Sequence, residues 1–149
     1  MKKGEIYEGV IEKVDFPNKG YVCIDDQKVL IKNGIPGQKV RFMIQKKRSG
    51  RAQGRILEVL EKSPLETREA VCSNFPACGG CMYQTMSYEN QLVMKETQIR
   101  ELLEEALVRG GQVDKNGQAD FDWEGIHGSP IEFGYRNKME FSFGDEYKD

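Results

Sequence analysis

The first 62 residues of the chain consist of short, alternating apolar segments separated by turn sequences, and this pattern limits the possible folds more than any other feature. The segments are 4–16, 21–25, 28–32, 39–47 and 55–62. They are rich in β-branched residues, and the turns "PNKG", "NGIPGQ" and "RSGRAQG" between them supply Gly, Pro and Asn. In the fourth segment Phe42 falls on the side expected to face the core. Five short strands at this spacing predict a small β-barrel over residues 1–62.

The second part of the chain has a different pattern, and Ser63–Pro64 is the expected boundary. A loop rich in cysteine is followed by apolar residues at helical spacing, which predicts a long helix over 87–109 with its leucine side buried. The sequence "YRNKMEFSFGDE" alternates and predicts a half-buried strand over 135–143. The expected fold class is α+β: a five-stranded, OB-like barrel, then a partial α/β domain over 63–149.

Charge is unevenly distributed along the chain. Residues 1–63 contain 14 Lys and Arg against 8 Asp and Glu, whereas residues 64–149 contain 8 against 16. The basic first part is therefore the candidate for binding a polyanion such as RNA. The cations of the loop between the last two strands are Lys46, Lys47, Arg48, Arg51 and Arg55. Loops of OB-like barrels commonly hold single-stranded nucleic acid, and a solvated charged edge is the alternative interpretation.

Other side chains extend the predicted RNA-binding surface. Phe16 and Tyr21 flank a turn of the barrel and are predicted to stack on unpaired bases, unless they only pack locally. Arg136 and Lys138 in the second part are expected to contact RNA phosphate, or Arg136 to pair with acidic neighbours. Trp123 has no partner pattern and is interpreted as local packing.

Three cysteines within ten residues form the other candidate site. Cys72, Cys78 and Cys81 have the spacing C-x5-C-x2-C in "CSNFPACGGC". Gly79 and Gly80 allow the tight curl that brings sulfur ligands to one centre. Thiolates select zinc or iron–sulfur centres, and clustered cysteines in a reducing compartment bind metal more often than they form disulfides. The three are therefore predicted metal ligands.

A fourth ligand is not evident from this spacing. Cys23 lies in a predicted strand and is interpreted as a small buried residue. His127 is the only histidine, and it would complete a Cys3His zinc site. The sequence contains neither an apolar run of roughly 20 residues, as a membrane span needs, nor a signal-peptide core. We expect a cytoplasmic protein without a membrane partner.

The sequence resembles a known family at three places. "CSNFPACGGCMYQTMSYENQLVMKETQI" resembles the iron–sulfur segment of the RNA uracil-5 methyltransferases, which methylate carbon 5 of uridine in ribosomal or transfer RNA with S-adenosylmethionine. "GYRNKMEFSFGD" is similar to the segment that follows in that family. Residues 4–62 resemble a TRAM domain, an OB-like barrel that binds RNA. The resemblance implies that the three clustered cysteines are three of the four ligands of a [4Fe–4S] cluster.

The same resemblance implies that the chain is the N-terminal portion of a longer enzyme. In the family, the fourth cluster cysteine, the catalytic cysteine and the domain that binds S-adenosylmethionine all follow the "YRNK" segment and have no counterpart here. The chain alone is therefore not expected to be catalytic. Its expected partner is structured RNA, in the first place ribosomal RNA. The alternative from a different class is a stand-alone RNA-binding module with a structural zinc site.

Overall fold

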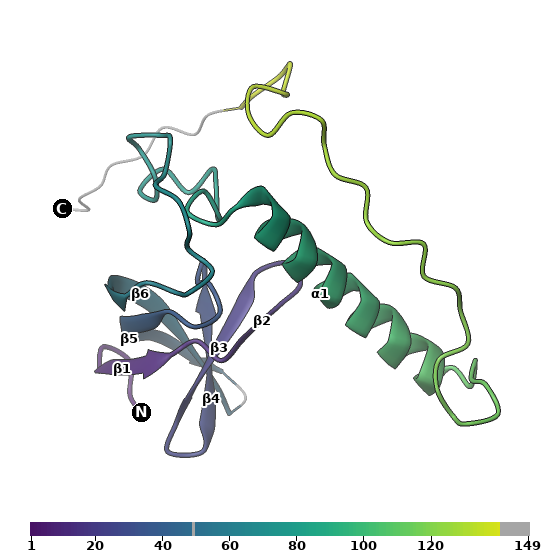
Figure 1. The fold of residues 1–149 in the computed structure, drawn as a ribbon. Helices are drawn as coiled ribbons and strands as arrows, with labels where there is room; N and C mark the ends of the chain where they lie inside the picture. The colour runs from purple at the N-terminus through teal and green to yellow at the C-terminus, as the bar shows by residue number, and fades with distance from the viewer. Residues whose placement is uncertain (49, 141–149) are drawn as a thin grey trace.

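The structure is a computed structural model that describes residues 1–48 and 50–140. A sheet curled into a barrel is followed by a loop, one long helix and an extended segment (Figure 1). The elements are β1 (Ile6–Val10), β2 (Lys13–Asp15), β3 (Lys19–Ile24), β4 (Gln27–Lys32), β5 (Lys39–Arg48), β6 (Arg51–Glu61) and α1 (Tyr88–Arg109). The expected α+β class with a barrel-like β part is confirmed, but the sheet has six strands rather than five.

The sixth strand arises because the predicted strand over 4–16 bends in its middle. The strand order is β1-β5-β6-β4-β3-β2, so β1 and β2 stand at opposite edges although only Ile11 and Glu12 separate them. The Ile11 N–H donates to the Gln38 carbonyl at 2.9 Å, and the Ile11 carbonyl accepts from the Gly37 N–H at 2.8 Å. These bonds take Ile11 out of the regular ladder. One bent strand thus supplies both edges and curls the sheet.

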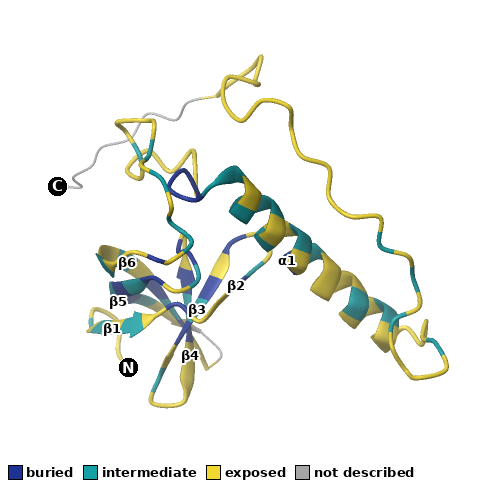
Figure 2. Cartoon of the chain, viewed as in Figure 1, coloured by how far each residue is buried: buried dark blue, intermediate teal, exposed yellow. Residues whose placement is uncertain are grey.

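The core fills the inside of this curled sheet. Its buried members are Ile11, Val14, Val22, Val29, Ile31, Val40, Phe42, Ile44 and Ala52. Phe42 is fully buried, which confirms its interpretation as core, and its ring lies 6.2 Å from that of Tyr7. Figure 2 shows that the buried residues are concentrated in the barrel, whereas α1 and the segment after it are mainly exposed.

The turn predicted over 48–54 is shorter than expected, because β6 begins at Arg51. Ala52 is buried, and a Cβ placed on Gly54 would lie 2.7 Å from the Phe42 ring. These small residues therefore let β6 pass close over the core instead of forming a loop. β4 and β6 form the parallel pair of the sheet.

α1 confirms the predicted helix. The Ser87 hydroxyl accepts from the Asn90 N–H at 3.2 Å and caps the first turn. The leucine side, which we expect to bury against a sheet outside this chain, is partly open here: Leu102 and Leu103 are 46% and 42% exposed. Within the described residues, no helix has the length and apolar character needed to cross a membrane.

The strand predicted over 135–143 is not formed in residues 135–140. A strand needs a neighbour for its backbone groups, and none of the described segments pairs with these residues. The remaining residues of that prediction, 141–143, lie outside the described part of the chain. Figure 1 shows the segment after α1 running back beside the helix as an extended chain.

Gly20 gives a test of how closely the barrel is packed. A Cβ on Gly20 would lie 2.8 Å from the Ile31 carbonyl oxygen, a backbone atom of the paired strand that cannot move alone. We expect Gly20→Ala to lower the free energy of unfolding by about 1–3 kcal/mol, measured by urea unfolding.

Cys23 on the same strand is exposed, contrary to its interpretation as buried, because its side chain points outward. Cys23→Ala is the control, and equal midpoints for the two variants would contradict this packing.

Candidate nucleic-acid interface

The hairpin of β5 and β6 carries a group of exposed cations. Lys46, Lys47, Arg51 and Arg55 are exposed, and none of them forms an ion pair with a described carboxylate. Arg48 lies opposite Arg51 in the strand pairing. We call these five residues the basic hairpin. The structure therefore brings together all the cations that the sequence predicts for this loop, on strands rather than on a flexible turn.

The basic hairpin lies at one end of the barrel. The parallel pairing of Val29 with Ala52 places it beside the turn between β3 and β4, which contributes Asp25 and Asp26. β6 has 11 residues, which extend over about 33 Å at the usual rise of a strand. The cysteine loop follows the other end of β6, where Ile35 packs against the residues that precede α1. The two candidate sites thus lie at opposite ends of the barrel (Figure 1).

The two aromatic residues predicted to stack on bases lie on one surface. Phe16 and Tyr21 both line a hollow of about 300 Å³ between the barrel and α1. Phe16 is 48% exposed. Lys13 lies in the same hollow, where its ammonium group is 2.6 Å from the Glu101 carboxylate. This hydrogen bond raises the pKa of Lys13. Because the ammonium group is paired with a carboxylate of α1, it is less available to a phosphate.

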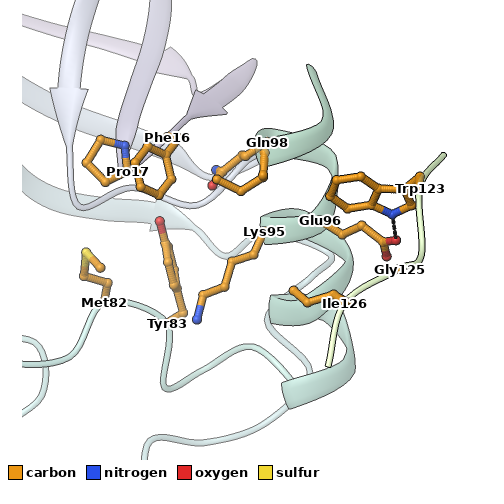
Figure 3. A pocket seen from close by; sticks show the side chains of 11 residues that line it. Phe16, Pro17, Met82, Tyr83, Lys95, Glu96, Gln98, Trp123, Gly125 and Ile126 are labelled. Carbon is orange, nitrogen blue, oxygen red and sulfur yellow. Dashed lines mark hydrogen bonds between the residues drawn. The ribbon is translucent and has the colours of Figure 1, made fainter. Parts of the chain in front are cut away.

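A second cavity lies on the other side of Phe16 and has a volume of about 420 Å³. Figure 3 shows that its walls come from the barrel, the end of the cysteine loop, α1 and the segment after the helix. These parts contribute Phe16, Tyr83, Lys95 and Trp123, respectively. The cavity therefore gathers three aromatic rings from segments that are far apart in the sequence.

The Tyr83 hydroxyl is an orphan polar group in this cavity wall. The residue is only 6% exposed, and its hydroxyl oxygen has no hydrogen-bond partner among the described residues. Burial raises the pKa of Tyr83 to about 12, so the group remains a protonated donor at neutral pH. Leaving a buried hydroxyl unpaired costs about 1–3 kcal/mol. Such a group is a candidate for contact with a ligand.

Trp123 is one of the cavity residues that sequence reasoning missed, with Tyr83 and Lys95. Its indole N–H donates to the Glu96 carboxylate at 2.5 Å, and its ring meets Phe121 edge to face at 6.3 Å. The contact with Glu96 crosses 27 positions and places Trp123 on α1 rather than in local packing alone. The only sequence signal was the isolation of a large aromatic residue in a polar segment.

The cysteine loop has part of the geometry of a thiolate site. Cys72, Cys78 and Cys81 are exposed. The Gly80 N–H donates to the Cys78 sulfur at 3.4 Å, and Gly79 has a φ of +67°, which favours glycine. Backbone N–H groups directed at sulfur stabilise a thiolate. The chemistry of the donors therefore fits a zinc or iron–sulfur centre.

The three sulfurs are not gathered into a finished site. Among the described residues, no group of three His, Cys, Asp or Glu side chains is placed to hold a metal ion. This applies to His127 and Cys23 as well as to the loop. The loop offers ligands of the right type, and a bound centre would have to draw them together.

Arg136 and Lys138 lie in the terminal segment and are exposed. The Arg136 guanidinium is 5.8 Å from the centre of the Tyr135 ring, and it forms no ion pair with a described carboxylate. Lys138 pairs with Glu140 at 2.7 Å. Their role in RNA contact stays a prediction.

The barrel and α1 are joined by buried polar contacts. Gln98 is the buried residue of α1, and its amide N–H donates to the Val14 carbonyl at 2.6 Å. The Asn18 side-chain amide donates to the Asn33 side-chain oxygen Oδ1 at 3.2 Å and, at the end of the cysteine loop, to the Met82 sulfur at 2.8 Å. These contacts position Phe16 between the two hollows.

The sequence of the chain is similar to those of several known proteins. No protein-family model matches the chain. The chain is 43% identical over 146 residues to a protein of Caldanaerobacter subterraneus subsp. tengcongensis, and 45% identical over 145 residues to one of Clostridium tetani. It is 37% identical over 148 residues to a protein of Clostridium acetobutylicum. All three are named uncharacterized RNA methyltransferases.

These matches cover nearly all of the chain but a minor part of the relatives. They include 98%, 97% and 99% of this chain, and 30%, 29% and 30% of the respective relatives. The chain thus spans about 30% of the length of the curated relatives it matches. The activity of those full-length proteins is therefore not assigned to this chain by the similarity alone.

Gln98 gives a test of the junction. We expect Gln98→Met to lower the free energy of unfolding by about 1–3 kcal/mol, because the buried Val14 carbonyl loses its donor. Urea unfolding monitored by circular dichroism measures the change. Thr97→Ala, at the adjacent exposed position, is the matched control. An unfolding midpoint of Gln98→Met equal to that of the control would show that the contact does not hold the helix.

Proposed function

We propose that this chain is the RNA-binding, N-terminal portion of an RNA uracil-5 methyltransferase that uses S-adenosylmethionine. The observation that carries the proposal is the basic hairpin. Its members Lys46, Lys47, Arg51 and Arg55 are exposed and have no described carboxylate partner, on a small barrel, in a chain whose relatives are named RNA methyltransferases. The barrel over residues 1–62 then acts as a TRAM domain. The uracil-5 assignment rests on the sequence resemblance.

The proposed partner is structured RNA, in the first place ribosomal RNA, with transfer RNA as the alternative. Cations on the hairpin contact phosphates, which supply affinity but little sequence information. The hairpin therefore holds the RNA, and selection of the uridine is left to other contacts. The transferred methyl group comes from S-adenosylmethionine, which we assign to a part of the enzyme outside this chain.

The proposed role of the cysteine loop is to hold an iron–sulfur cluster. Cys72, Cys78 and Cys81 would supply three of the four ligands of a [4Fe–4S] cluster, with the fourth outside this chain. Support comes from the exposed thiols, the Gly80 N–H directed at sulfur and the resemblance of the segment. Bound there, the cluster would cross-link the loop at the end of the barrel that adjoins α1. A structural zinc in a stand-alone module is the competing assignment.

The basic hairpin predicts a specific loss of salt-dependent binding. We expect Lys46→Ala combined with Lys47→Ala to weaken binding of a single-stranded oligoribonucleotide roughly tenfold at low salt, and to reduce the slope of log affinity against log salt by about 1.4. Two phosphate contacts are lost, so fewer counterions are released on binding. Fluorescence anisotropy at several salt concentrations measures both values.

The matched control removes two lysines from the other end of the barrel. Lys39 and Lys62 pair with Glu61 and Glu69, respectively, so Lys39→Ala with Lys62→Ala changes the net charge equally without removing free cations. The control should keep the slope of the unchanged chain. Equal effects of the two double variants would mean that net charge, and not the hairpin, determines RNA affinity.

The cysteine loop predicts the metal content of protein purified without oxygen. In the full-length enzyme, which would supply the fourth ligand, we expect iron and acid-labile sulfide together with a broad visible absorption band, and we expect Cys78→Ser to lose most of the iron and sulfide. Cys23→Ser, which changes an exposed thiol outside the loop, should retain both. Zinc without sulfide would contradict the cluster assignment and support the zinc module.

A further inference from the structure

We propose that the 420 Å³ cavity between the barrel, the cysteine loop and α1 binds one unpaired nucleobase of the RNA. This inference rests on the proposed function, since it requires that the chain binds RNA. It adds a base-binding pocket to the phosphate-binding hairpin. The pocket is at a distance from the hairpin and differs from it in chemistry.

The walls of the cavity suit a flat, aromatic ligand. Phe16, Tyr83 and Trp123 contribute three rings from three segments, and Figure 3 shows them around one space. Proteins recognise unpaired bases mainly by stacking them on such rings. The volume is within the range of small-ligand pockets, which begins at about 300 Å³. A single base with part of its ribose is a ligand of suitable size.

The orphan hydroxyl of Tyr83 supplies the second, independent observation. It is a buried donor without an acceptor among the described residues, and Figure 3 shows it directed toward Phe16. Carbonyl oxygens and ring nitrogens of a base are acceptors that would satisfy it. The hydroxyl oxygen is buried in the free chain, so a base reaches it through a movement of the cavity wall that keeps Phe16 as a stacking surface. The Phe16 ring is already 48% exposed, which leaves room for that movement.

The polar groups at the rim favour a nucleotide over a purely apolar ligand. Lys95 is exposed and forms no ion pair with a described carboxylate, so its ammonium group is available to a phosphate or a base carbonyl. Glu96 accepts from the Trp123 indole N–H at 2.5 Å, which holds its carboxylate toward the indole. A purely apolar ligand would offer no acceptor to Lys95 or to the Tyr83 hydroxyl.

The single tryptophan makes the cavity directly observable. Trp123 is the only tryptophan of the chain, so its fluorescence reports on this cavity alone. The probe is a fluorescently labelled 12-nucleotide oligouridylate, whose binding is followed by anisotropy, while an unlabelled copy is used for tryptophan quenching. Uridine monophosphate and inorganic polyphosphate are titrated separately. We expect quenching by the oligouridylate and none by polyphosphate, which has no base to stack.

Two variants test the residues. We expect Phe16→Ala to weaken oligouridylate binding about tenfold through the loss of one stacking surface, with the salt slope unchanged. We expect Tyr83→Phe to weaken binding about fivefold through the loss of one hydrogen bond, while it raises the melting temperature of the free protein because the orphan hydroxyl is gone. Leu57→Ala removes an exposed apolar side chain of β6 outside the cavity, and should change neither value.

The outcomes separate this inference from the proposed function. Oligouridylate that binds by anisotropy but leaves Trp123 and the two variants unaffected would overturn the pocket, and would indicate that a polypeptide segment covers it; the RNA-binding function would stand. Quenching by uridine monophosphate with none by the oligouridylate would assign the cavity to a free nucleotide, and would also overturn the proposal. Absence of any oligouridylate binding would overturn the proposed function itself.

Discussion

The bend at Ile11 is the constraint on which the rest of the structure depends. Because Ile11 exchanges backbone hydrogen bonds with Gly37 and Gln38, one strand pairs with β5 before the bend and with β3 after it. The sheet is thereby curled over its own core, and its two edge strands are parts of one continuous segment. The same bend directs β2 and Phe16 toward α1. The hollow and the cavity beside the helix follow from this arrangement.

The proposed RNA-binding surface combines two kinds of interaction at different places. The basic hairpin offers free charge at one end of the barrel, and the aromatic cavity offers stacking near the other. α1 carries acidic residues, including Glu101, which already pairs with Lys13. Exposed charges are screened over about 8 Å at physiological salt. RNA is therefore expected to follow the barrel and to approach the helix chiefly at the cavity, where uncharged rings determine contact.

The sequence predicted the features that depend on local pattern. The barrel-like sheet, the buried position of Phe42 and the long helix follow from alternation and helical spacing. The division of the first strand was not predicted, because it depends on hydrogen bonds to the distant segment that contains Gly37. The basic hairpin was predicted as a set of residues, but its extension into β6 depends on how Gly54 packs against the core.

Features that depend on distant partners were predicted poorly. The strand over 135–143 has the correct alternation, yet its described part has no neighbour to pair with. The leucine side of α1 has helical spacing, but spacing does not indicate what will cover it. Trp123 was interpreted as local packing, because its contact with Glu96 joins segments with no shared pattern. In each case the missing information concerned a contact between distant segments.

The most direct test of the central claim, that this barrel is an RNA-binding unit, is an NMR titration of the isotope-labelled chain with a single-stranded oligoribonucleotide. The account predicts amide shifts concentrated between Lys46 and Arg55, which saturate with RNA and diminish as salt is raised. Shifts spread evenly over the surface, or absent from the basic hairpin while RNA binds elsewhere, would contradict it.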